Sequence, residues 1–270
     1  AITVQYFNSA DNIGLSANSF KELSKLNSAY KVTNIKSIGK ANHPYASVLF
    51  ASTLHSEEDE QKESDKKLLF KMKNGSSSID DIFEIQLPEN SINLEYIAAR
   101  YENRIEEFAF VEPDYEIEDF NPIEFETLSI GSSQDTEKIR RKVFKSTVKR
   151  WPLVAVIDTG TDIFHEDIRN NRWDNRREIY RNEKDDDSND FTDDKFGWDF
   201  INKNDKSYVD KQGHGTHISG LISRTTNSKI MPLKIIENKK GNLSSVIKAI
   251  KYAADNNADI INFSIGTTQK

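Results

Sequence analysis

The chain has 270 residues and a formal net charge of −7, with 44 acidic and 37 basic residues. This balance lacks the basic character of nucleic-acid-binding proteins, so we expect no nucleic-acid partner. The absence of cysteine excludes disulfides and thiol nucleophiles. No apolar run approaches the roughly 20 residues that cross a bilayer, so we also expect no membrane span.

Residues 1–120 are predicted to form a small α+β unit, because short alternating runs and helical spacings succeed one another. The expected strands are residues 2–7, 30–38, 82–87 and 108–111. The expected helices are residues 19–26, capped by Asn18 or Ser19, and residues 94–101. The polar run over residues 55–67 is interpreted as a solvated loop or helix face.

Residues 121–149 are weakly patterned and predict a linker. Pro122 and the Gly131-Ser132-Ser133 run are typical of loops, and the basic stretch that follows predicts a helix.

Residues 151–270 change in character and predict a parallel α/β sheet. Leu153–Ile157 and Ile230–Ile236 are continuous apolar runs, typical of strands buried on both faces. Leu243–Ala254 has helical spacing, with Val246, Ile247, Ile250 and Ala254 on one face, and Asp259–Ile265 is a third strand. Strand, helix and strand in this order indicate a βαβ unit.

Asp158 directly follows the first buried strand, in the segment VAVIDTG. The carboxyl ends of parallel strands are where α/β proteins place their sites. A helix N-cap is the alternative role for this aspartate, since Asp is favoured there.

The segment Gly213-His214-Gly215-Thr216-His217 is the second motif. Glycine on both sides of His214 allows close backbone approach, and the residues after it predict a buried helix. The two histidines could instead hold a metal ion, but no third ligand or HExxH pattern accompanies them.

Taken together, VAVIDTGTD, GHGTHISG, KIMPLKII, GNLSS and ADIINFSIG resemble the subtilase family of serine proteases in order and spacing. The resemblance covers residues 151–270 and implies a subtilisin-like parallel sheet flanked by helices, incomplete in this chain. It also implies a serine endopeptidase with polypeptide substrates and no organic cofactor. The family's triad runs Asp, His, Ser along the chain.

Carried over to this sequence, the resemblance makes Asp158 the orienting acid and His214 the general base. It further implies that two segments pair with substrate as extended strands. These substrate-binding residues are Gly241, Asn242 and Leu243 in one segment and Ser264, Ile265 and Gly266 in the other.

The family's nucleophile motif, Gly-Thr-Ser-Met, does not occur in these 270 residues. Neither Gly266-Thr267-Thr268 nor Ser76–Ser78 can replace it. We therefore expect a companion C-terminal segment to carry the serine. The alternative is an inactive pseudoprotease or interaction fragment.

The stretch from Asp81 to Tyr115 resembles the second half of a subtilase prodomain, a ferredoxin-like α+β unit that acts as chaperone and inhibitor of its own protease. A prodomain implies a zymogen processed in the linker. The sequence starts without the basic and apolar regions of a signal peptide. We expect a secreted or cell-surface protein whose signal peptide has been removed; a cytoplasmic one is the alternative.

The acidic run from Asp185 to Asp194 predicts a calcium loop, because oxygen ligands alternate along it. The expected ligands are Asp185, Asp187, Asn189 and Asp193; a solvated acidic loop is the alternative. Asp167 matches a family calcium ligand more weakly.

The order Asp158-Thr159-Gly160-Thr161 after an apolar strand also occurs in aspartic proteases. That chemistry needs two carboxylates sharing a proton. Only one such motif is present, and the other matched segments would stay unexplained.

Overall fold

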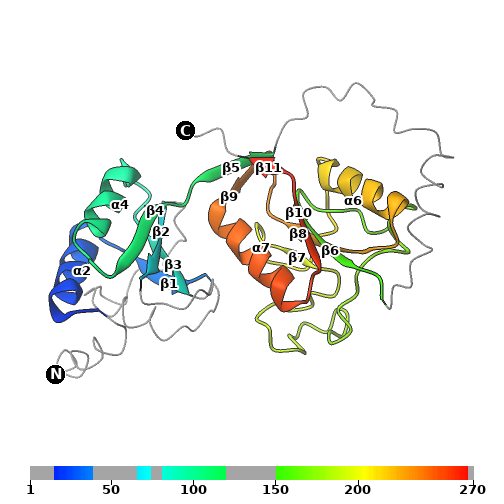
Figure 1. Cartoon of the computed structure of the whole chain (residues 1–270), viewed down its shortest axis with the longest axis horizontal. Coiled ribbons are helices and arrows are strands. Elements are labelled where there is room, and N and C mark those ends of the chain that lie inside the picture. The colour runs from blue at the N-terminus through cyan, green and yellow to red at the C-terminus, as the bar shows by residue number, and fades with distance from the viewer. Residues whose placement is uncertain (1–14, 39–65, 74–80, 120–149, 267–270) are drawn as a thin grey trace. The chain divides into compact units, whose positions relative to one another are not determined.

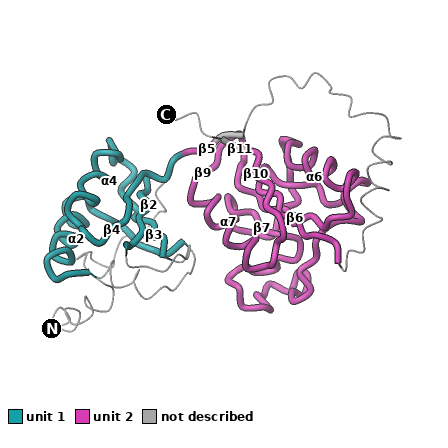
Figure 2. Tube along the Cα trace, viewed as in Figure 1, with its two compact units in different colours: residues 1–115 teal, residues 116–270 magenta. Residues whose placement is uncertain are grey.

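The computed structural model describes residues 15–38, 66–73, 81–119 and 150–266 (Figure 1). The expected strand at residues 2–7, most of the polar run at 55–67, the linker at 121–149 and the serines at 76–78 lie outside the described residues. The chain forms two compact units, residues 1–115 and 116–270 (Figure 2). Within the described residues, no helix is both long and apolar enough to cross a bilayer.

The first unit contains a four-stranded antiparallel sheet in the order β1-β3-β2-β4. Its strands are β1 (Asn34–Ser37), β2 (Lys67–Met72), β3 (Ile82–Gln86) and β4 (Phe108–Pro113), and its described helices are α2 (Ala17–Ala29) and α4 (Leu94–Glu102). We did not predict β2, which holds an interior position. Leu68, Leu69 and Phe70 are all fully buried, so the strand shows no alternation.

Helix α2 begins earlier than predicted. Its N-cap is Ser16, whose hydroxyl accepts from the Ser19 backbone N–H at 3.1 Å, so the expected caps Asn18 and Ser19 were wrong. Its partner α4 is joined to it by a buried hydrogen bond from the Tyr101 hydroxyl to Asn27 Oδ1, at 2.9 Å. In the sheet, the ring of Phe70 stacks on Phe83 and Phe108, with centroids 5.0 and 4.5 Å away.

The second unit is built on a parallel sheet in the order β10-β6-β8-β7, as the α/β prediction required. Its strands are β6 (Leu153–Asp158), β7 (Trp198–Asp199), β8 (Lys229–Lys234) and β10 (Ile260–Phe263). Helices α6 (His214–Thr225) and α7 (Leu243–Asp255) flank it (Figure 1). Val154 and Val156 pack toward α6, while Ala155 and Ile157 lie in the cluster that contains α7.

The buried face of α7 differs slightly from the predicted one. Val246 is buried as expected, but Ala254 is exposed, and Ala249, Tyr252 and Ala253 complete the buried face. The reason is aromatic packing. The Tyr252 ring meets Phe191, Phe200 and Trp173 edge-on, at centroid distances of 5.0, 6.0 and 6.4 Å.

A third, three-stranded sheet in the second unit has the order β11-β5-β9 and is antiparallel throughout. Its strands are β5 (Glu116–Asp119), β9 (Lys240–Asn242) and β11 (Ile265–Gly266). Because β5 pairs with β9 and β11, the unit boundary falls at residue 116, before the end of the predicted 1–120 unit.

Candidate active site

Asp158 is the last residue of β6 and is fully buried. One of its oxygens, Oδ1, accepts from the Thr159 backbone N–H at 2.7 Å. The apolar run that makes β6 a central strand therefore ends by placing a carboxylate out of water. Such a group needs hydrogen-bond donors around it.

His214 supplies the second donor. It is the first residue of α6, and its Nδ1 lies 2.8 Å from Oδ1 and 3.0 Å from Oδ2 of Asp158. The N-cap, Gly213, has a φ of 80°, in the left-handed region that favours glycine. Since Nδ1 faces the carboxylate, Nε2 is the ring nitrogen left for proton exchange. The ring is 17% exposed, which gives it access to a reactant.

A close backbone approach makes this pair possible. A Cβ placed on Gly215 would lie 2.0 Å from the Gly160 carbonyl oxygen and 3.1 Å from the Asp158 side chain. Gly160 itself has a φ of 115°, and a Cβ there would lie 2.8 Å from the Val209 carbonyl oxygen. Glycine at position 215 thus lets the first turn of α6 touch the loop after β6, and glycine at position 160 lets that loop lie against the backbone of residues 207 and 209.

A second carboxylate, Asp210, ties the same two segments together. Its Oδ1 accepts from the Thr159 hydroxyl and the Gly213 N–H, both at 2.9 Å. Its Oδ2 accepts from the N–H and hydroxyl of Thr216 at 2.9 and 2.7 Å. The Gly215 N–H completes the connection by donating to the Thr159 hydroxyl at 3.0 Å. Asp210 was not predicted as a site residue, although it lies only four residues before His214.

Burial raises the pKa of Asp158, and hydrogen bonds from Thr159 and His214 oppose the rise. The carboxyl group is therefore removed from water, and these hydrogen bonds are what stabilise its ionised form. Among the described residues no second carboxylate hydrogen-bonds to Asp158, and its side-chain partner is an imidazole.

A buried lysine lies beside this aspartate on the neighbouring strand. Lys234 is the register partner of Asp158, and its Nζ donates to the Val209 carbonyl at 3.2 Å and lies 3.3 Å from Glu237 Oε1. Hydrogen bonds from Asn202 and Lys211, together with Lys234, lower the pKa of Glu237 to about 2. The Val209 carbonyl that Lys234 binds is the one that lies against Gly160.

The segments predicted to bind substrate flank β5. Gly241 and Asn242 lie in β9, and Ile265 and Gly266 form β11, whereas Leu243 begins α7 and Ser264 precedes β11. Between the two strands, Ile117 of β5 pairs with Gly241 and Glu118 pairs with Gly266. The side chain of Ile117 is buried in the core of the second unit.

Among the described residues, Asp185 and Asp193 of the predicted calcium ligands are not grouped with Asp187 in a cluster of neighbouring carboxylates. Asp185 accepts from the Asn189 and Asp190 N–H groups at 3.1 and 2.7 Å, and Asp193 accepts from the Asn182 and Glu183 N–H groups at 3.0 and 2.9 Å. These carboxylates brace the loop. Calcium binding by the predicted set stays a prediction.

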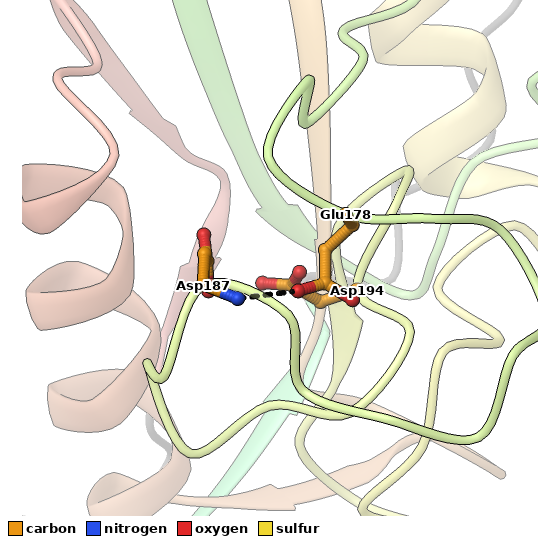
Figure 3. A group of neighbouring side chains, drawn as sticks. All are labelled: Glu178, Asp187 and Asp194. Carbon is orange, nitrogen blue, oxygen red and sulfur yellow. Dashed lines mark hydrogen bonds between the residues drawn. The ribbon is translucent and has the colours of Figure 1, made fainter.

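A different acidic cluster forms within this loop, from Glu178, Asp187 and Asp194 (Figure 3). One carboxylate oxygen from each residue lies within 4.8 Å of the other two. The Asp186 and Asp187 N–H groups donate to Glu178 Oε1 at 2.9 and 3.2 Å, and the Tyr252 hydroxyl donates to Asp194 Oδ2 at 2.6 Å. Of the three, only Asp187 was predicted from the sequence as a ligand.

Two oxygens of this cluster, Glu178 Oε2 and Asp187 Oδ1, are buried and accept no hydrogen bond. Burial raises the pKa of both Glu178 and Asp194. The cluster offers only carboxylate oxygens, and two of them lack hydrogen-bond partners. Such a set fits a hard divalent cation such as calcium. Asp167 lies apart from it, 4.0 Å from Arg224, and His217 is exposed. Among the described residues the cluster is the single group of this kind.

Comparison with known proteins relates this unit to one family. Residues 149–270 match the model of the subtilase family. The chain is 38% identical over 124 residues to subtilisin-like protease 1 of Plasmodium vivax, covering 41% of this chain and 20% of that protein. It is 32% identical over 125 residues to a thermophilic serine proteinase of Bacillus sp. (strain AK1), covering 42% and 25%.

A third relative, the cell wall-associated protease of Bacillus subtilis (strain 168), is 30% identical over 127 residues. That match covers 42% of this chain and 12% of the relative. The chain thus spans a quarter or less of the length of these three curated relatives.

We predict that Gly215→Ala separates His214 from Asp158, because its Cβ would meet the Gly160 carbonyl. The variant should lose on the order of 2 kcal/mol of unfolding free energy or more, as overpacking does. Denaturant unfolding measures this. Gly220→Ala is the matched control in the same helix: a Cβ there meets nothing within 4 Å, so it should gain up to about 1 kcal/mol from helix propensity. Equal stabilities for the two variants would contradict the close approach.

Proposed function

On the premise that residues 149–270 belong to the subtilase family, we propose that the complete protein is a serine endopeptidase acting on polypeptides. The observation that carries this proposal is the contact of His214 Nδ1 with the buried carboxylate of Asp158. Binding alone would not need an imidazole held against a buried carboxylate in this geometry at the end of a strand. An inactive protein that only binds partners is the alternative.

In the proposed reaction, His214 Nε2 takes the proton of a serine hydroxyl as the oxygen attacks the peptide carbonyl carbon. The imidazolium then gives this proton to the leaving amine, and water hydrolyses the acyl-enzyme with the same base. Asp158 holds the imidazole by Nδ1 and stabilises its charged form. No serine among the described residues hydrogen-bonds to His214.

We propose that a further polypeptide segment supplies this serine and continues the sheet beyond β10. The exposure of that strand supports the proposal. Ile260, Ile261 and Phe263 are 52%, 39% and 46% exposed, although β10 pairs with the central strand β6. Several exposed apolar residues on an edge strand are otherwise an aggregation hazard.

The test is His214→Ala in the complete natural protein, whose intact mass would identify the polypeptide with the Gly-Thr-Ser motif. We expect kcat to fall by several orders of magnitude with little change in KM, because the base acts in the transition state. His165→Gln is the control, since His165 is exposed and its Nδ1 accepts from the Asp167 backbone N–H at 3.2 Å, not from a group of the pair. Near-normal turnover of the His214 variant would contradict the assignment, and an inactive wild type would favour the binding-only alternative.

We further propose that residues 1–120 are a prodomain, that the complete protein is a zymogen, and that it is cut within residues 121–149. The position of β5 supports this, because it pairs by backbone hydrogen bonds with the two strands expected to hold substrate. Antiparallel strand addition of this kind is how extended peptides bind to sheet edges. Ile117 adds apolar burial, and the exposed Glu116 pairs with Lys240 at 2.6 Å.

Ile117→Asp should therefore release inhibition before processing, since a carboxylate would replace a buried isoleucine. We expect the uncut complete protein to become measurably active towards a peptide substrate, at least about tenfold above the uncut wild type. Glu116→Gln is the control and should change latency little, because exposed ion pairs contribute about 1 kcal/mol or less. An uncut wild type as active as the cut enzyme would refute the inhibitory role.

Calcium is the third part of the proposal. We propose that Glu178, Asp187 and Asp194 hold one calcium ion that stabilises the acidic loop. The unpartnered, buried oxygens of Glu178 and Asp187 support this, because an unpaired buried carboxylate is costly. A calcium-stabilised protease would suit a secreted or cell-surface location, which we also propose.

Millimolar calcium should raise the midpoint of thermal unfolding relative to EDTA, by linkage to the folded state. Asp194→Asn should abolish the shift, whereas Asp185→Asn should keep it, because Asp185 accepts only from backbone N–H groups. Retention in the first variant and loss in the second would instead favour the ligand set predicted from sequence.

The pH dependence gives a second readout of the same site. The pKa values of Glu178 and Asp194 are raised in the folded state. Without calcium, their contribution to stability is therefore present at low pH and is lost as pH rises through the folded pKa values. Calcium should remove this loss, because it favours the ionised carboxylates. Melting curves across this pH range, with and without calcium, measure it.

A further inference from the structure

A basic pocket lies at the end of the parallel sheet opposite Asp158. It has a volume of about 490 Å³ and is lined chiefly by Arg169, Arg172, Trp173, Asp174, Arg176 and Lys229. Lys229 begins β8 and is in register with Leu153, the first residue of β6, whereas Asp158 is the last. The backbone N–H of Trp173 donates to the Ile230 carbonyl at 2.7 Å, which fixes this wall of the pocket to β8.

The charges in this pocket are unbalanced. Its one carboxylate, on Asp174, already lies 3.1 Å from Lys195 Nζ. Lys229 Nζ donates to the Asn170 carbonyl at 3.0 Å, and the guanidinium of Arg172 lies 4.6 Å from the centroid of the Phe196 ring. Within the described part of the chain, no carboxylate forms an ion pair with Arg169, Arg172 or Arg176.

Other arginines of the same unit do have acidic partners. Arg150 makes a two-pronged contact with Asp259 at 2.6 and 2.7 Å, and Arg177 lies 3.1 Å from Asp187. Three guanidinium groups around one cavity therefore have no acidic partner, although the net charge of the chain is −7. Their mutual repulsion is relieved if an anion binds among them.

We propose that this pocket binds a multiply charged phosphoryl anion. The planar guanidinium group donates two parallel hydrogen bonds to phosphate oxygens, and several such groups around one cavity suit a ligand with more than one phosphate charge. The pocket is independent of the proposed proteolysis, since it involves neither the Asp158–His214 pair nor the strands beside β5.

The test is calorimetric titration of the complete protein with pyrophosphate, also followed by tryptophan fluorescence, to which Trp173 in the pocket contributes. We expect one site per chain and affinity that falls with added salt, as screening requires. Arg169→Gln with Arg176→Gln should weaken binding by about tenfold or more, the loss of charge-assisted hydrogen bonds. This pair leaves Arg172 in place over Phe196, so the fold should be kept.

Arg224→Gln is the matched control, because it removes one exposed positive charge from α6, outside the pocket. It should change pyrophosphate affinity by less than about twofold. Equal binding by the wild type and the double variant, or no binding by the wild type, would overturn the proposal.

A second arm separates the possible sources of the phosphoryl group. Vesicles of phosphatidylglycerol and phosphatidylcholine are compared with phosphatidylcholine alone. Binding to the anionic vesicles that pyrophosphate displaces would assign a lipid headgroup, and pyrophosphate binding without vesicle binding would assign a soluble ligand. Vesicle binding that the double variant retains would contradict the pocket.

Discussion

The burial of β6 on both faces is the constraint on which the second unit depends. Neighbouring strands β8 and β10 occupy both of its edges, and residues alternate between a cluster with α6 and a cluster with α7. A strand enclosed in this way can end only in a loop that satisfies its own polar groups. Asp158 is the first such group, and its donors come from the next residue and from a helix that starts 56 residues later. The contact between Gly160 and Gly215 is therefore a consequence of the buried strand end.

The buried carboxylates of the second unit differ in how many of their oxygens have hydrogen-bond partners. Asp158 receives donors from the chain itself, so that both of its oxygens are engaged with His214. In the acidic loop, by contrast, Glu178 and Asp187 each keep one buried oxygen without a donor. The Asp158 site therefore needs no ligand to satisfy its carboxylate, while the acidic cluster leaves two carboxylate oxygens that a ligand could contact. The basic pocket is the opposite case, in which guanidinium groups lack an anion.

The sequence predicted best where a physical rule has a clear pattern. Continuous apolar runs located β6 and β8, and the glycines around His214 predicted the close approach that the structure contains. Strand β2 could not be found from alternation, because Leu68 and Leu69 point to opposite faces of the sheet and are both fully buried. The ligands of the acidic loop could not be predicted from residue spacing for another reason. Ser188, Asp190 and Asp193 have positive φ values, so the backbone turns and alternate residues do not all face one side.

The pairing of β5 with β9 and β11 uses backbone groups, which every polypeptide carries. A substrate entering between the same strands would therefore compete with β5 for the same hydrogen bonds. The two competitors differ in entropy, because β5 belongs to the same chain and does not have to be captured from solution. A tethered segment acts at an effective concentration on the order of millimolar, whatever the dilution of the protein. Cutting the chain after β5 would leave every hydrogen bond unchanged and yet make occupancy dependent on dilution, so that a single peptide bond would determine which strand fills the sheet.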